Sequence, residues 1–140
     1  MIVIDASVAV KWYFPEVGSI EAIELLGHSA GWLRGPDMLA VEVCASFVRG
    51  VNMDKSRNAD AFTFVADFKL KQEDGTVSLH RLAATQAAQA SIMAIDIGHP
   101  LKDCIYLVLA MELGCPLVTA DARFAAKARD VYGDVRVLGE

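Results

Sequence analysis

The sequence predicts an α/β protein, a sandwich of helices around a mostly parallel sheet. Short apolar runs alternate along the chain with longer segments of helical periodicity, as in sheets whose strands are joined by helices. The strand-like runs at 2–4 and 117–118 are continuously apolar, which is typical of strands buried on both faces. A length of 140 residues, 54% of them hydrophobic, suits one domain with a single core, residues 1–140.

The first half of the chain is expected to contain two strands and three helices. Ile2, Val3 and Ile4 are consecutive β-branched residues, typical of a central parallel strand, and the run ends at Asp5. Asp37 is a suitable N-cap residue for the helix that follows it. The expected elements are a strand at 2–4, helices at 7–14, 19–26 and 37–50, and a weak strand at 32–33 that is closed by Gly35 and Pro36.

The second half is expected to contain four helices and three strands. The pattern at 59–71 is that of an amphipathic helix capped by Ser56. Its inward face is expected to be Phe62, Val65, Ala66 and Phe68. A nearly all-apolar helix body at 104–113 is stopped by Gly114 and Pro116, so this helix is expected to be buried on most sides. The other expected elements are helices at 82–95 and 122–131 and strands at 77–79, 117–119 and 135–138, the last at the edge of the sheet.

The composition limits what the protein can bind and where it can work. A net charge of -5 does not attract polyanions, so contact with nucleic acid would need a local basic patch. Cys44, Cys104 and Cys115 lie in apolar runs without Cys-x-x-Cys spacing, which indicates reduced core residues. No basic leader is present, and the longest uncharged stretch, 82–95, is shorter than the roughly 20 residues of a membrane span. We expect a soluble, cytoplasmic protein.

Four carboxylates stand out by their positions. Asp5 and Asp121 each follow a predicted strand, and ligands of parallel sheets bind beyond the carboxyl ends of the strands. Asp103 begins the buried helix, and Glu42 lies within an apolar run of another helix. Each acid alone has an ordinary interpretation as a helix cap or a solvated side chain. As a set they are expected to form one site, because an apolar element does not carry an unpaired acid for its own stability.

The four acids together indicate a metal site. Carboxylates that share one cleft repel one another, and a hard divalent cation relieves the repulsion. Mg²⁺ prefers oxygen ligands and keeps water molecules that can attack a phosphorus atom. Ser7 and Thr119, which lie beside Asp5 and Asp121, are either ordinary turn hydroxyls or groups that orient a carboxylate or a metal-bound water.

The order of the acids and their flanking residues resembles the PIN-domain ribonucleases, and within them the VapC-type toxins of type II toxin-antitoxin systems. The resemblance extends over the full chain. The segments that carry it are Ile2-Val-Ile-Asp5-Ala-Ser7, Pro36-Asp-Met-Leu-Ala-Val-Glu42, His99-Pro-Leu-Lys-Asp103 and Leu117-Val-Thr-Ala-Asp121-Ala-Arg-Phe124.

The resemblance implies a three-layer sandwich around a five-stranded sheet and an endoribonuclease that depends on Mg²⁺ or Mn²⁺. It also implies a homodimer and a cognate antitoxin whose tail blocks the cleft. Carried over by position, it implies that the metal-binding catalytic acids are Asp5, Glu42, Asp103 and Asp121, with Thr119 as a supporting polar residue. In some relatives the residue three positions beyond the last acid is a further acid, whereas here it is Phe124.

Basic residues near the acids are candidates for contacts with RNA phosphates, with a solvated helix face as the alternative. They are Lys11, Lys102, Arg123 and Lys127. The three histidines lack metal-ligand spacing, and His99, which precedes a proline, is interpreted as a loop residue. The aromatic run at 12–14 is core, a dimer contact or part of an antitoxin groove.

Other functions keep part of this pattern. A catalytically silent PIN-like module that binds a partner protein would keep the fold and is the alternative function. A phosphoacceptor receiver domain needs paired acids after the first strand, and an aspartyl phosphatase needs Asp-x-Asp there, but Asp5 is followed by Ala6 and Ser7. A dinucleotide-binding fold is disfavoured because no Gly-x-Gly-x-x-Gly occurs.

Overall fold

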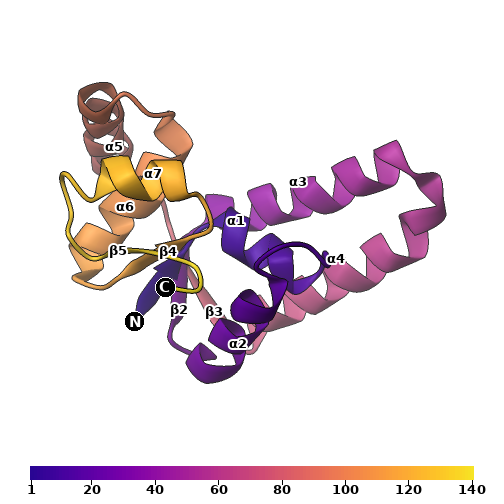
Figure 1. Cartoon of the computed structure of the whole chain (residues 1–140). Helices are drawn as coiled ribbons and strands as arrows, with labels where there is room; N and C mark the ends of the chain where they lie inside the picture. The colour runs from indigo at the N-terminus through magenta and orange to yellow at the C-terminus, as the bar shows by residue number, and fades with distance from the viewer.

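A computed structural model describes the whole chain, residues 1–140, and a sheet of five parallel strands forms its centre (Figure 1). The strand order is β3-β2-β1-β4-β5, and every neighbouring pair is parallel. The strands are β1 (Ile2–Ile4), β2 (Leu33–Pro36), β3 (Val77–His80), β4 (Leu117–Thr119) and β5 (Val135–Val137). The predicted α/β class and five-stranded sheet are confirmed, with β5 at an edge as expected.

Helices cover both faces of the sheet and make three layers. Figure 1 shows α5, α6 and α7 on one side and α2, α3 and α4 on the other, with α3 and α4 forming a hairpin that extends beyond the sheet. The helices are α1 (Ala6–Ala9), α2 (Ser19–Ser29), α3 (Met38–Met53), α4 (Asn58–Glu73), α5 (Ala84–Ile97), α6 (Leu101–Leu113) and α7 (Ala122–Ala128), with short 3-10 helices η1 (Val10–Trp12) and η2 (Lys55–Arg57). None of these helices is both long and apolar enough to cross a membrane.

The helix α6 is the most deeply buried helix of the protein. All residues from Cys104 to Ala110 are buried, and α6 packs against β1, β2 and β4 on one side and α5 on the other. Gly114 ends α6 in the left-handed conformation, with φ 61°, as predicted for its C-cap. The apolar sequence of α6 follows from this position between the sheet and a second helix.

The strand β2 is longer than the sequence indicates, because Gly35 and Pro36 belong to the strand instead of closing it. Proline lacks an N–H group, so it fits in a sheet only where no neighbouring strand needs that donor. β1 pairs with β2 only at Leu33 and Arg34, so β3 is the only neighbour beside Pro36. Gly35 is required by packing, because a Cβ atom there would lie 2.6 Å from Cδ2 of Leu39.

The predicted cap of α4 is wrong, and that of α3 is right only in position, because Asp37 occupies the N-cap of α3 without a capping bond. Asp37 makes no side-chain capping bond, and its Oδ1 instead lies 3.4 Å from the backbone N of Leu82. Ser56 belongs to η2, where Asp54 accepts a hydrogen bond from the Ser56 backbone N–H at 3.1 Å. α3 continues to Met53, and η2 begins at Lys55.

The predicted inward face of α4 is only partly right. Phe68 is fully buried, but Phe62 is 69% exposed, Val65 is 41% exposed and Ala66 is also exposed. The residue that accompanies Phe68 toward the core is Phe64, which packs against the buried residues. The apolar residues of α4 lie on several sides, so the pattern by itself does not fix the rotation of the helix.

An aromatic cluster between η1 and the α3–α4 hairpin sets that rotation. We call this set the aromatic cluster: Trp12, Tyr13, Phe14, Phe47, Phe64 and Phe68. The Tyr13 ring centroid lies 5.1 Å from that of Phe47 and 5.3 Å from that of Phe64. Its hydroxyl donates to Asp67 at 2.7 Å, and Trp12 Nε1 donates to a carbonyl of α2 at 3.0 Å. Of the interpretations left open for residues 12–14, the structure shows core packing.

Candidate active site

Two of the four predicted acids follow neighbouring strands. β1 and β4 are paired with Ile4 beside Val118, so Asp5 and Asp121 leave the sheet at the same edge. Asp5 is 4% exposed, whereas Asp121 is exposed. Asp121 caps α7, because its Oδ1 accepts a hydrogen bond from the N–H of Phe124 at 3.0 Å.

The other two acids come from helices that meet this edge. Glu42 lies in α3 and Asp103 in the first turn of α6. Burial raises the pKa of Glu42, Lys102 lowers it and Asp103 raises it further. An oxygen of Asp103 lies within 4.8 Å of one of Asp121. The structure thus places Asp103 beside Asp121, and the charge of Asp103 acts on Asp5 and Glu42, but neither Asp5 nor Glu42 belongs to the group of ligand atoms that lie within 4.8 Å of one another. We call Asp5, Glu42, Asp103 and Asp121 the acidic pocket.

Asp5 is buried deeply enough to resist ionisation. Burial raises its pKa from 3.8 to about 6, although hydrogen bonds from Ser7 and Thr119 favour the charged form; the nearby charge of Asp103 raises it further. Desolvation therefore outweighs the hydrogen bonds that this carboxylate receives within the protein.

Ser7 and Thr119 contact the acids that they were predicted to support. The Ser7 hydroxyl donates to Oδ1 of Asp5 and accepts from the backbone N–H of Ala120 at 2.9 Å. Thr119 is fully buried and its Oγ1 accepts from the backbone N–H of Asp121 at 3.1 Å. The two hydroxyls therefore join the end of β1 to the end of β4.

Two buried polar atoms beside the acidic pocket have no hydrogen-bond partner within the protein. They are Oε1 of Glu42 and the hydroxyl of Tyr106. Burial raises the pKa of Tyr106, as do the charges of Glu42, Asp5 and Asp103, so its hydroxyl lies among these carboxylates. The only signal for Tyr106 in the sequence was its spacing of three residues from Asp103.

The residues of the acidic pocket fit a hard divalent cation. A buried polar atom without a partner costs about 1–3 kcal/mol, and the pocket contains such an atom on one of its own carboxylates, Glu42. The charge of Asp103 raises the pKa of both Asp5 and Glu42. Oxygen donors of this kind are the ligands that Mg²⁺ and Mn²⁺ prefer.

His99 is a further polar residue at the site, and the sequence interpretation as a simple loop residue missed it. Its Nε2 lies 2.6 Å from Oδ2 of Asp103, and its side chain is only 10% exposed. Ligand atoms of His99, Asp103 and Asp121 all lie within 4.8 Å of one another. The available signal was the spacing of four residues between His99 and Asp103, which brings side chains together across the start of a helix.

A cleft of about 340 Å³ opens beside Glu42. Its polar lining includes Ser7, Glu42, Arg49 and Lys102. Lys102 was predicted to bind a phosphate, and in the structure it lies near Glu42. Arg49 lies about two turns along α3 from Glu42 and was not predicted. These two cations give the cleft a local positive charge in a protein of net negative charge.

The other predicted basic residues differ in their freedom to bind a phosphate. Arg123 is exposed in the first turn of α7. Lys11 is engaged elsewhere, since its Nζ donates to Oε1 of Glu16 at 3.0 Å and to a nearby carbonyl. Lys127 is also engaged, because its Nζ donates to the carbonyl of Gly98 at 2.6 Å. The geometry therefore favours Lys102 and Arg123 over Lys11 and Lys127.

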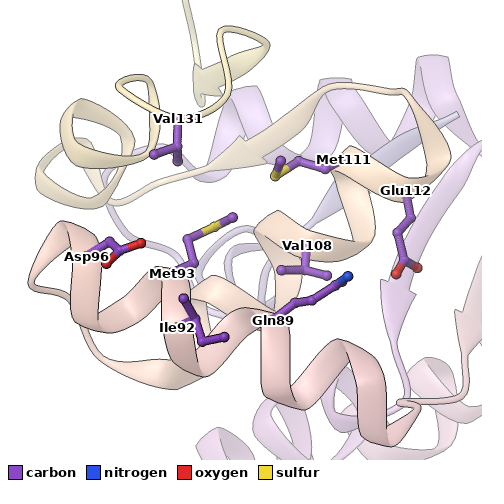
Figure 2. Close-up of a pocket in the computed structure, with 8 residues that line it drawn as sticks. All are labelled: Gln89, Ile92, Met93, Asp96, Val108, Met111, Glu112 and Val131. Atoms are coloured by element: carbon purple, nitrogen blue, oxygen red, sulfur yellow. The ribbon is translucent and has the colours of Figure 1, made fainter.

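A second cavity, of about 470 Å³, lies between α5, α6 and the segment after α7 (Figure 2). Most of its lining is apolar, with Met93, Val108 and Met111 among the residues drawn in Figure 2. Asp96 and Glu112 lie at opposite ends of this cavity. It contains none of the four predicted acids, so it is separate from the acidic pocket.

Comparison with known proteins agrees with this geometry. A family model described as PIN domain matches residues 2–130. The fold is similar to that of PAE2754 from Pyrobaculum aerophilum, with a TM-score of 0.69, 16% identity, and coverage of 98% of this chain and 88% of that one. It is also similar to VapC20 of Mycobacterium tuberculosis, a toxin that cleaves the sarcin-ricin loop, with a TM-score of 0.69, 14% identity, and coverage of 90% and 94%. Among curated protein sequences no match was found.

Proposed function

This chain belongs to the PIN domain family, and we propose that it is a metal-dependent endoribonuclease that hydrolyses phosphodiester bonds of RNA. The family is one of nucleases, and the resemblance to VapC-type toxins narrows the substrate to RNA. The observation that best supports the proposal is the unpaired, buried Oε1 of Glu42 within a group of repelling carboxylates. Such a group has little value for stability and is suited to holding a divalent cation.

In this proposal the four acids of the acidic pocket are the metal ligands, and Ser7 and Thr119 orient Asp5 and the backbone of Asp121. When bound by these acids, Mg²⁺ or Mn²⁺ would supply positive charge at the reacting phosphate and would activate water. Lys102 and Arg123 bind phosphate oxygens and position the RNA. Hydrolysis forms a bond between the water oxygen and phosphorus, breaks one P–O ester bond, and passes a proton to the leaving oxygen.

We also propose that the protein is the toxin of a toxin-antitoxin pair. The similar fold of VapC20, which cleaves the sarcin-ricin loop, supports a structured RNA as the substrate. A cognate antitoxin protein would block the cleft beside Glu42. A homodimer and a cytoplasmic location complete the proposal, and the three free cysteines agree with a reducing compartment.

The test is RNA cleavage by the wild-type protein and two aspartate variants. With Mg²⁺ or Mn²⁺, the wild-type protein is expected to cut an RNA pool that contains ribosomal, transfer and messenger RNA, and EDTA is expected to stop it. Asp103→Asn should lower the cleavage rate by at least about 100-fold, because it removes a charged ligand from the acidic pocket. Asp130→Asn changes an exposed aspartate beyond the end of α7 and should leave the rate unchanged.

Two results would contradict the proposal. Wild-type protein that binds Mg²⁺ but leaves every RNA intact would favour the catalytically silent module that binds a partner protein. Equal cleavage by wild type and Asp103→Asn would assign the activity to a contaminant or to another site.

A further inference from the structure

The segment that joins α5 to α6 is fixed in place by contacts on three sides. The N–H of His99 donates to the carbonyl of Ala94 at 3.0 Å, after Gly98 has ended α5 with φ 64°. Lys127 of α7 donates to the carbonyl of Gly98 at 2.6 Å. The His99 ring stacks on Phe124 of α7, with centroids 4.7 Å apart and an interplanar angle of 28°. A histidine in an ordinary exposed loop would have none of these side-chain constraints.

The constrained ring of His99 is directed at one acid of the pocket. Nε2 of His99 lies 2.6 Å from Oδ2 of Asp103, and the two side chains are 10% and 30% exposed. A carboxylate can only accept a hydrogen bond, so Nε2 carries the proton and donates. The bond is charge-assisted and holds Oδ2 of Asp103 in one position.

Helix α7, which carries Phe124, also positions another acid, Asp121. Asp121 begins α7 and accepts the N–H of Phe124, the residue whose ring supports His99. The ligand atoms of His99, Asp103 and Asp121 therefore lie within 4.8 Å of one another through contacts with a single helix. Phe124 is fully buried, so the support for His99 is part of the core.

We propose that His99 is a positioning residue of the candidate metal site, held by Phe124 and Lys127, and that it orients the Asp103 carboxylate for the cation. The inference rests on the proposed function for the presence of a cation at the acidic pocket. Groups that hydrogen-bond to a metal ligand fix its orientation, and their loss typically lowers metal affinity by 10–100-fold. The aromatic residue at position 124, where some relatives carry an acid, thereby has a use: its ring supports the histidine.

The test measures cation binding without RNA, by calorimetric titration of wild-type protein and variants with Mg²⁺ and with Mn²⁺. His99→Leu removes the donor and is expected to weaken the binding of both ions by about 10–100-fold. His99→Gln keeps an N–H donor near the position of Nε2 and is expected to restore affinity to within about 3-fold of wild type. His28→Leu, a change to an exposed histidine of α2, is the matched control and should bind as wild type does.

A second variant keeps the inference testable if His99→Leu does not fold. Phe124→Leu keeps an apolar side chain but removes the stacked ring, and it is expected to weaken both ions by up to about 10-fold. The melting temperature of each variant in EDTA reports whether its core is intact.

The outcomes separate this inference from the proposed function. Unchanged affinity in His99→Leu and Phe124→Leu would overturn the positioning role. Equal loss in His99→Leu and His99→Gln, larger for Mn²⁺ than for Mg²⁺, would overturn it in favour of direct ligation, because imidazole binds Mn²⁺ better than Mg²⁺. A wild-type protein that binds neither ion would overturn both proposals. If the variants show the expected cation affinities but the wild-type protein cleaves no RNA, the positioning role of His99 would stand and only the proposed nuclease activity would be rejected.

Discussion

The aromatic cluster and the acidic pocket both contain polar groups that are at least partly buried, but these groups are paired in the aromatic cluster, whereas two buried atoms in or beside the acidic pocket have no partner. In the aromatic cluster, the Tyr13 hydroxyl donates to Asp67, and Lys71 pairs with the same carboxylate. In the acidic pocket, Oε1 of Glu42 and the hydroxyl of Tyr106 have no partner within the protein.

The difference separates a region that stabilises the fold from a region that leaves buried polar atoms unpaired. Burial of rings is favourable, and every polar atom named in the aromatic cluster is paired. Burial of a carboxylate is unfavourable, and it raises the pKa of Asp5 to about 6. Substitutions in the two regions should therefore act on stability with opposite sign.

The largest expected effect is a loss of stability in the aromatic cluster. Phe47→Ala should lower the free energy of unfolding by about 3–5 kcal/mol, because Phe47 is 1% exposed and contacts three other rings. Urea unfolding measures the change. Phe62→Ala, at a 69% exposed position of α4, is the control and should change it by about 0.5 kcal/mol or less. Equal losses in the two variants would show that Phe62 packs in the core and that α4 is rotated differently about its axis.

The second prediction is a gain of stability from a substitution in the acidic pocket. In EDTA at pH 8, Asp5→Asn should raise the free energy of unfolding by about 3 kcal/mol, which corresponds to a pKa of about 6 in the folded state against 3.8. A raised pKa favours the folded state at low pH, so the wild-type deficit should shrink as the pH falls below 6 and vanish below about 3.8. Urea unfolding at pH 8, 6 and 4 measures this trend.

The sign of that trend is the discriminating result. A gain that is constant with pH would show that Asp5 is not responsible through its charge. Asp130→Asn should give no pH-dependent difference, because this aspartate is exposed. The same Asp5→Asn variant should lose cation binding, which makes it more stable and less functional.

The smallest expected effect compares one chemical change in both regions. Tyr106→Phe removes an unpaired buried hydroxyl and should raise the free energy of unfolding in EDTA by about 1 kcal/mol. Tyr13→Phe removes a hydroxyl that donates to Asp67 and should lower it by about 1 kcal/mol. Thermal or urea unfolding of both variants measures the pair. A change of the same sign in both would mean that the Tyr106 hydroxyl is already satisfied.

Much of the fold could be predicted because its signals are local. The β-branched run at β1 and the stop signals after α6 identify their elements without knowledge of the rest of the chain. The hydrogen bonds of Asp37 and Ser56 could not be predicted from the local sequence. The side chain of Asp37 accepts from the backbone N–H of Leu82. The backbone N–H of Ser56 donates to Asp54. The strand at Gly35 and Pro36 depended on how far the adjacent strand extends.

The candidate site divides in the same way. The acids at Asp5 and Asp121 could be placed at one edge, because parallel strands end together. The contacts of His99 with Asp103 and Phe124 could not be predicted from spacing, because they depend on how α7 packs over the segment before α6. Lys127 looked available for a phosphate, and only the structure shows that it binds the carbonyl of Gly98.

By itself, the sequence determined the α/β class, the buried helix α6 and the positions of Asp5 and Asp121 after buried strands. These follow from hydrophobic periodicity and from the cost of desolvating a carboxylate, which act within short segments. The tertiary structure alone decided the rotation of α4, the unpaired atoms of Glu42 and Tyr106, and the support of His99 by α7. Each of these depends on which side chains from distant segments share one space, and no local pattern carries that information.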